Sequence, residues 1–236
     1  MNSLIYSYLK TGLFYLIYSF IFSIILKQSV YSFLTIFTTF TIIYYVLHYR
    51  IDSKTDSNNY SGPIKDYFDN LKQKYSLDNT VLRNTEKTIG EVLYKRNTNI
   101  ICIPNEIKNK EEEKSLAAHE LGHVYYNHRD KYIIGKFINI VLSILLLSVA
   151  ININKISIIF ISVGFVLFGT PVILNYIQHR FEYQADKFAV KNSSTESLSR
   201  RLRRNNTNMN SILLNYIPYL SSHPKLEKRI RKIHDF

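Results

Sequence analysis

Apolar residues gather in four stretches along this chain, and polar residues fill the segments between them. The first two stretches are joined only by Lys27 and Gln28, and the last two only by residues 152–155. Each pair therefore predicts a helical hairpin whose two ends return to the same side. The stretches are Thr11–Leu26 (with a possible extension back to Leu4), Ser29–Leu47, Phe137–Ile151 and Ile156–Leu174.

The alternative for these stretches is a set of core helices buried inside a soluble protein. Crossing a bilayer takes about 20 apolar residues, and the first and third stretches are shorter than that. Four such stretches in 236 residues would, however, leave too little polar chain to cover them. We predict four transmembrane helices in a multi-pass protein of the cell membrane. A cleavable signal peptide is not expected, because no basic segment precedes the first stretch.

The polar segments predict an α+β domain at the membrane surface, interrupted by the second hairpin. Apolar spacing predicts a helix over 63–75, and Glu91–Lys95 with Asn99–Glu106 predicts a β-hairpin. The fold class is therefore mainly α, with four transmembrane helices and a small sheet. The predicted domains are residues 1–48 (first hairpin), 49–131 (first part of the surface domain), 132–178 (second hairpin) and 179–236 (second part).

The run His119-Glu120-Leu121-Gly122-His123 is the strongest chemical signal in the chain. In a helix that starts near Glu111, the two histidines lie one turn apart on one face, so both can bind one zinc ion. Glu120 then lies beside the water on that ion. A helix with two ordinary histidines is the alternative, because the motif has only three fixed letters.

A catalytic zinc ion needs a third protein ligand. Glu182 is the best candidate, because Asp186 follows it four residues later on the same helix face and could hold a ligand imidazole through its other ring nitrogen. The spacing of the metzincin class is excluded by Tyr126 and Arg129. His128, five residues after His123, is predicted to face solvent.

These motifs resemble one known family. HELGH, then EYQAD after an apolar hairpin, then Ser221-Ser222-His223-Pro224 at the start of a basic helix are similar to the membrane-bound gluzincins of the HtpX-like and CAAX prenyl protease type. The resemblance spans about residues 85–236. It implies one zinc ion on His119, His123 and Glu182, with Glu120 as catalytic base and Asp186 behind the ligands.

The resemblance also implies that His223 and Arg229 lie near the site and steady the reaction intermediate. One departure concerns the strand before the zinc helix, which usually carries an Asn-Ala-Phe…Pro-Gly-Gly stretch. The run Asn99–Glu106 lacks those glycines, so the substrate preference of the family does not carry over. An exposed strand edge can still bind a peptide by strand addition.

Positive charge predicts the orientation in the membrane. Residues 179–236 hold 12 Lys and Arg against 5 Asp and Glu, which places the termini and the zinc domain in the cytoplasm. The basic run Arg200–Arg204 fits topology first and anionic lipid second, and nucleic acid is not expected as a partner. The single cysteine, Cys102, excludes an internal disulfide and is expected to be buried in a strand.

The predicted function is a membrane-embedded zinc endopeptidase that hydrolyses peptide bonds through a zinc-activated water, with Glu120 as general base. Protein or peptide substrates, above all misfolded membrane proteins, and the lipid bilayer are the expected partners. Two alternatives stay open. One is a CAAX-type processing protease, and the other is a zinc-binding membrane sensor or scaffold in which Glu120 would be dispensable.

Overall fold

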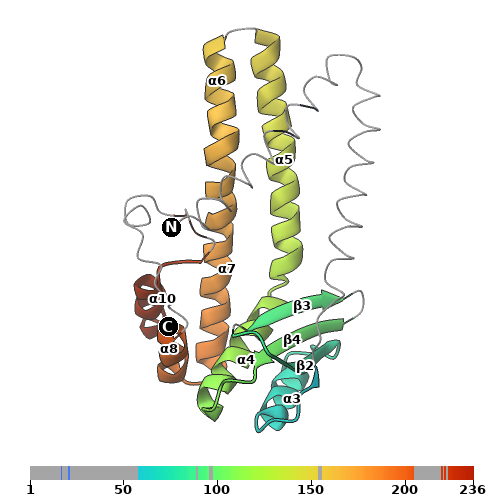
Figure 1. Cartoon of the computed structure of the whole chain (residues 1–236), viewed down its shortest axis with the longest axis vertical. Helices are drawn as coiled ribbons and strands as arrows, with labels where there is room; N and C mark the ends of the chain where they lie inside the picture. The colour runs from blue at the N-terminus through green and yellow to red at the C-terminus, as the bar shows by residue number, and fades with distance from the viewer. Residues whose placement is uncertain are drawn as a thin grey trace. The chain divides into compact units, whose positions relative to one another are not determined.

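The computed structural model describes residues 17, 21, 58–88, 90–95, 98–153, 156–204, 219, 221 and 223–236 (Figure 1). The chain divides into two compact units. The hairpin unit comprises Met1–Val46, Asp130–His179 and Asn210–His223. The α/β unit comprises Leu47–Arg129, Arg180–Met209 and Pro224–Phe236. The predicted first hairpin falls outside the described residues except for Ile17 and Ile21.

A four-stranded sheet forms one layer of the α/β unit. Its strand order is β1 (Asn58–Asn59), β2 (Thr80–Thr85), β4 (Thr98–Pro104) and β3 (Glu91–Lys95). Strands β2 and β4 are parallel, whereas β3 pairs with β4 in antiparallel register, with Val92 opposite Ile101. The predicted β-hairpin is therefore confirmed. Within the described residues, β3 and β1 are the edges of this sheet.

The central strand β4 is apolar because both of its faces are covered. Ile101 and Ile103 point into the main core, whereas Ile100 and Cys102 form a smaller cluster with Leu93 of β3. Alternate side chains of a strand point to opposite faces, so one run of β-branched residues serves both clusters. This explains an uninterrupted apolar run in place of strict alternation.

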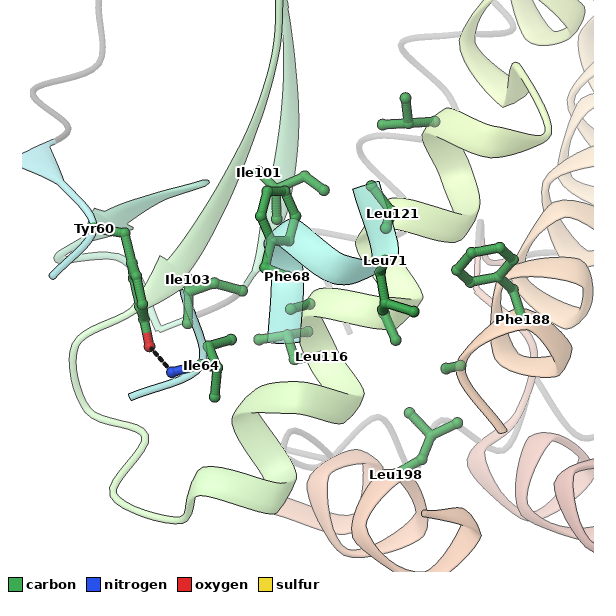
Figure 2. Close-up of a cluster of buried hydrophobic side chains, with 14 of the residues drawn as sticks. Tyr60, Ile64, Phe68, Leu71, Ile101, Ile103, Leu116, Leu121, Phe188 and Leu198 are labelled. Atoms are coloured by element: carbon green, nitrogen blue, oxygen red, sulfur yellow. Dashed lines mark hydrogen bonds between the residues drawn. The ribbon is translucent and has the colours of Figure 1, made fainter. Parts of the chain in front are cut away.

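Helices α3 (Lys65–Lys74) and α4 (Lys110–Tyr125) cover one face of the sheet. Phe68 and Leu71 of α3, with Ile64 just before it, pack against Ile101, Ile103 and Leu116 (Figure 2). The helix predicted over 63–75 is confirmed, and it is observed as α3 over Lys65–Lys74. Tyr60 ties the start of α3 to α4, because its hydroxyl accepts a bond from the Ile64 amide (3.3 Å) and donates one to Glu113 Oε1 (2.6 Å).

Two further helices, α8 (Thr195–Arg204) and α10 (Leu226–His234), complete the α/β unit. Leu198 of α8 and Ile233 of α10 enter the main core beside α4. Glu112 of α4 is buried and lies 3.0 Å from Arg204 Nη1, which ties the basic end of α8 to the first turn of α4. The basic helix α8 is thus held in part by a buried carboxylate.

Most of α5 (His128–Ile153) lies in the hairpin unit, followed by α6 (Ile156–Gly164), the π-helical turn η1 (Phe165–Gly169) and the first part of α7 (Thr170–Asn192), up to His179 (Figure 1). The helix Ser157–Asn192 is long and apolar enough to cross a membrane, and it is the one described helix that meets this measure. Large apolar side chains on its surface are exposed, among them Phe160 at 71% and Ile161 at 73%. Lipid is a more favourable surrounding than water for such a face.

Pro171 lies within the helix and does not end it. Proline removes one backbone donor, and the wider π turn just before it accommodates this loss. The Thr170 hydroxyl donates to the Val166 carbonyl (2.6 Å), and Asn139 Nδ2 of α5 donates to the Thr170 carbonyl (3.1 Å). The helix therefore continues to Asn192 and carries Glu182 and Asp186.

Cys102 is 1% exposed, and burial raises the pKa of its thiol to about 11, with the Glu91 carboxylate adding to the effect. The reactive thiolate is then scarce at pH 8. We expect iodoacetamide to leave Cys102 unmodified in the folded chain at pH 8 and to modify it fully after denaturation. Rapid labelling of the native chain, followed by mass spectrometry, would contradict the buried position.

Candidate metal centre

Helix α4 brings the two histidines of the HELGH motif together. Its first turn is capped by Asn109, whose side chain accepts bonds from the amides of Glu111 (2.9 Å) and Glu112 (3.3 Å). Acidic residues in that turn favour the positive end of the helix dipole. His119 and His123 lie one turn apart along the helix, and their Nε2 atoms are 3.2 Å from each other.

Helix α7 supplies the third member of the group. Glu182 Oε2 is 3.7 Å from His119 Nε2, and Glu182 Oε1 is 3.8 Å from His123 Nε2. Zinc binds nitrogen and oxygen at about 2.0–2.2 Å, so two ligand atoms on one tetrahedral ion lie about 3.3 Å apart. The three side chains offer ligand atoms that all lie within 4.8 Å of one another, and they fit one zinc ion.

A close approach between α4 and α7 makes this convergence possible. A Cβ atom built on Gly122 would lie 3.1 Å from the Cα atom of Ala185 and 3.1 Å from the Cβ atom of Phe188. Ala185 is fully buried at this contact. The small volume of Gly122 therefore favours the close approach, in the turn of α4 that carries both histidines.

Asp186 lies behind His119. The distance between Asp186 Oδ1 and His119 Nδ1 is 3.0 Å, although the ring N–H is not aligned with the carboxylate oxygen as a strong hydrogen bond requires. A carboxylate this close to the ring favours a hydrogen on His119 Nδ1 and leaves Nε2 for the metal. Burial lowers the pKa of His119, but the hydrogen-bonding contact and charge of Asp186 outweigh burial and raise it, with Glu182 and Glu120 adding to this effect.

Arg229 of α10 joins the two carboxylates of α7. Its Nη1 is 2.9 Å from Glu182 Oε2, and its Nε and Nη2 donate to the two oxygens of Asp186 at 2.8 and 2.6 Å. Burial alone would lower the pKa of this guanidinium, but Asp186 and Glu182 raise it above its ordinary value. Arg229 therefore stays charged and fixes both acidic side chains.

His128 does not face solvent, so the prediction for this residue is wrong. It is 3% exposed, and its Nδ1 lies 2.9 Å from Nδ1 of His123. The reason is Asn127, whose φ of 51° interrupts the helix between α4 and α5, whereas the prediction assumed a continuous helix. Asparagine adopts this left-handed conformation more readily than most residues, and it was the signal in the sequence that reasoning by helical spacing missed.

Burial lowers the pKa of His123 to about 3, against the opposing effect of Glu182. At neutral pH the ring is therefore uncharged and has one lone pair free for a metal. Glu120 is 8% exposed and follows His119 directly on α4. His223 is exposed and belongs to the hairpin unit, so its predicted role near the site stays a prediction.

Comparison with known families identifies the group to which this arrangement belongs. The model of peptidase family M48 matches residues 93–236, which include α4, the second hairpin, α7 and α10. The chain belongs to peptidase family M48. Members of family M48 are zinc metallopeptidases, which confirms the resemblance found in the sequence and identifies zinc as the metal of the site.

A solved structure shares the fold of this family M48 chain. The crystal structure of S. mikatae Ste24p is similar at 19% sequence identity, with a TM-score of 0.62. The match covers 98% of this chain and 62% of the Ste24p chain, so this chain spans less than two thirds of that protein. Among curated proteins, none matches the sequence significantly.

Proposed function

We propose that this chain is a membrane-embedded zinc endopeptidase that cleaves polypeptides at the membrane surface. The observation that carries the proposal is the convergence of His119, His123 and Glu182, with Glu120 next to the first histidine. Two imidazoles and one carboxylate supply three ligands, which leaves the fourth position of a tetrahedral zinc ion open, as in catalytic zinc sites. The membrane location rests on the exposed apolar face of the helix Ser157–Asn192.

The residues of the site divide the work of hydrolysis. When bound, zinc lowers the pKa of a water molecule to about 7 and polarises the scissile carbonyl. Glu120 takes the proton from the attacking water and passes it to the leaving amine, so its carboxylate acts first as base and then as acid. Asp186 and Arg229 hold His119 and Glu182 in place while the proton moves.

A peptide substrate is proposed to bind along β3. This strand pairs only with β4 among the described strands, so its outer edge offers backbone donors and acceptors. An extended peptide can add to such an edge as a further strand. Backbone pairing reads little of the side-chain sequence, which suits a protease that removes misfolded membrane proteins. We propose this role, with the α/β unit facing the cytoplasm.

The experiment that tests the proposal is zinc removal and replacement. We expect the detergent-purified chain to hold one zinc ion and to cleave unfolded casein, to lose both with 1,10-phenanthroline, and to regain both when zinc is added. A chain that binds zinc but cleaves neither casein nor any other unfolded protein would instead support the sensor or scaffold alternative. A chain that binds no zinc would overturn the proposal.

A CAAX-type processing protease is the second candidate, and the shared fold with Ste24p is the observation in its favour. The two candidates differ in what they cleave. A processing enzyme is expected to cut a farnesylated C-terminal peptide and to leave its unprenylated form and casein intact. A quality-control protease is expected to cut casein whether or not any substrate carries a lipid.

A further inference from the structure

His128 and Gln184 form a hydrogen-bonded pair that the reaction described above does not use. His128 Nε2 lies 2.9 Å from Gln184 Oε1, and His128 Nδ1 lies 2.9 Å from His123 Nδ1. The rings of Phe181 and Tyr126 stack on the His128 ring, with centroids 4.4 and 5.6 Å away and interplanar angles of 13° and 17°. The imidazole is thus fixed in its plane as well as at both nitrogens.

The chemistry of these groups gives the chain of hydrogen bonds one direction. An amide oxygen only accepts, so His128 Nε2 must donate to Gln184 Oε1. A neutral imidazole has a single N–H, which leaves His128 Nδ1 as an acceptor. The nitrogen that faces it, His123 Nδ1, must then be the donor.

This direction decides which nitrogen of His123 can bind a metal. With its hydrogen on Nδ1, His123 has its lone pair on Nε2, the atom 3.2 Å from His119 Nε2 and 3.8 Å from Glu182 Oε1. The opposite direction, with the Gln184 amide turned over, would leave a hydrogen on His123 Nε2. That hydrogen would point at the other two ligands and block the metal.

We propose that Gln184 and His128 are positioning residues that hold His123 in the tautomer that binds zinc. The proposal rests on the proposed metal site and explains how its second histidine is prepared. The two ligand histidines are then oriented by different means. A buried carboxylate, Asp186, lies behind His119, whereas an uncharged relay lies behind His123.

The test compares zinc affinity among variants of the detergent-purified full chain at pH 8. Zinc dissociation constants are measured by competition with a chromophoric chelator, and the thermal midpoint of each zinc-free variant is measured alongside. The variant His128→Phe keeps a flat ring between the same neighbours but has no nitrogen. We expect it to bind zinc about ten- to a hundredfold more weakly, as loss of such a partner does in other zinc sites.

Two changes at Gln184 test the direction of the hydrogen bonds. Gln184→Glu keeps an acceptor for His128 Nε2 and is expected to bind zinc more tightly than Gln184→Met, which removes that acceptor. If Gln184 had a purely structural role, the zinc affinities of these two variants would not follow their ability to accept a hydrogen bond. His234→Phe, at an exposed histidine of α10, is the matched control and is expected to change nothing.

Each outcome has a separate meaning. Wild-type affinity in His128→Phe, with an unchanged zinc-free thermal midpoint, would overturn the relay and leave the metal site standing. Equal zinc affinities in Gln184→Glu and Gln184→Met would overturn the proposed direction of the hydrogen bonds from His123 through His128 to Gln184. If the wild-type chain binds no zinc, the proposed function and the relay both fail.

Discussion

Replacing Glu120 with glutamine is expected to reduce peptide hydrolysis by at least about a hundredfold, the range attributed to a positioned general base. Glutamine has nearly the same shape as glutamate but cannot take a proton from the attacking water. His119, His123 and Glu182 are unchanged in this variant, so zinc binding is expected to stay at one ion per chain. Zinc content and casein cleavage, measured on the same preparation, check both expectations.

The matched control is Glu111→Gln, in the first turn of the same helix α4. The Glu111 side chain is exposed and pairs with Lys114 at 2.7 Å. That variant should cleave casein at the wild-type rate. Retained cleavage in Glu120→Gln, with its zinc content verified, would remove Glu120 from the reaction. Loss of zinc from the same variant would instead assign it a structural role at the metal.

Arg229→Met is expected to produce the largest loss of stability among the substitutions considered. Methionine keeps the length of the arginine stem but leaves the carboxylates of Glu182 and Asp186 buried beside each other without a positive charge. Removing one partner from a buried ion pair costs about 3–5 kcal/mol. We expect the zinc-free variant to unfold at a markedly lower temperature, and added zinc to recover part of the loss by restoring positive charge.

Arg231→Met serves as the control, because Arg231 is exposed on the same helix. Thermal unfolding of both variants, with and without zinc, separates the contribution of the ion-pair network from that of helix α10 itself. Equal melting temperatures for the two zinc-free variants would show that Arg229 does not hold the carboxylates together. Arg229→Lys should fall between the wild type and Arg229→Met, since lysine cannot form the paired contacts with Asp186.

Local patterns in the sequence were sufficient for some elements of the α/β unit, whereas strands β1 and β2 and helix α8 were not predicted. The spacing of Ile64, Phe68 and Leu71 predicted α3, and the β-branched run around Ile101 predicted the hairpin of β3 and β4. These elements are determined by short-range periodicity and by burial of one face. The parallel pairing of β2 with β4 was not predicted, because it depends on contacts between residues distant along the chain.

The site shows the same division between local and distant effects. The four-residue spacings in HELGH and EYQAD indicated which side chains share a helix face, and the structure brings those faces together. The pairing of Arg229 with both carboxylates depends on tertiary packing, and only the family resemblance pointed to that residue. His128 was predicted wrongly because one left-handed residue, Asn127, changed the direction of the chain.

Pro171 lies inside a helix that continues past it. Proline usually ends or kinks a helix because it lacks an amide hydrogen. In this chain the π turn Phe165–Gly169 precedes it, and the side chains of Thr170 and Asn139 bond to neighbouring carbonyls. These compensating bonds come partly from another helix, so a reading of the fourth apolar stretch by itself could not include them.

The contact between Gly122 and Ala185 limits how far sequences of this type can diverge. Substitution of a metal ligand is a familiar way to lose such a site, but position 122 has no chemical group that could be lost. Its constraint is volume, since any larger residue must separate the two backbones that carry the ligands. A related sequence can therefore keep every residue of the metal group and still hold those residues at a different spacing, because a single added methyl group moves the two helices apart.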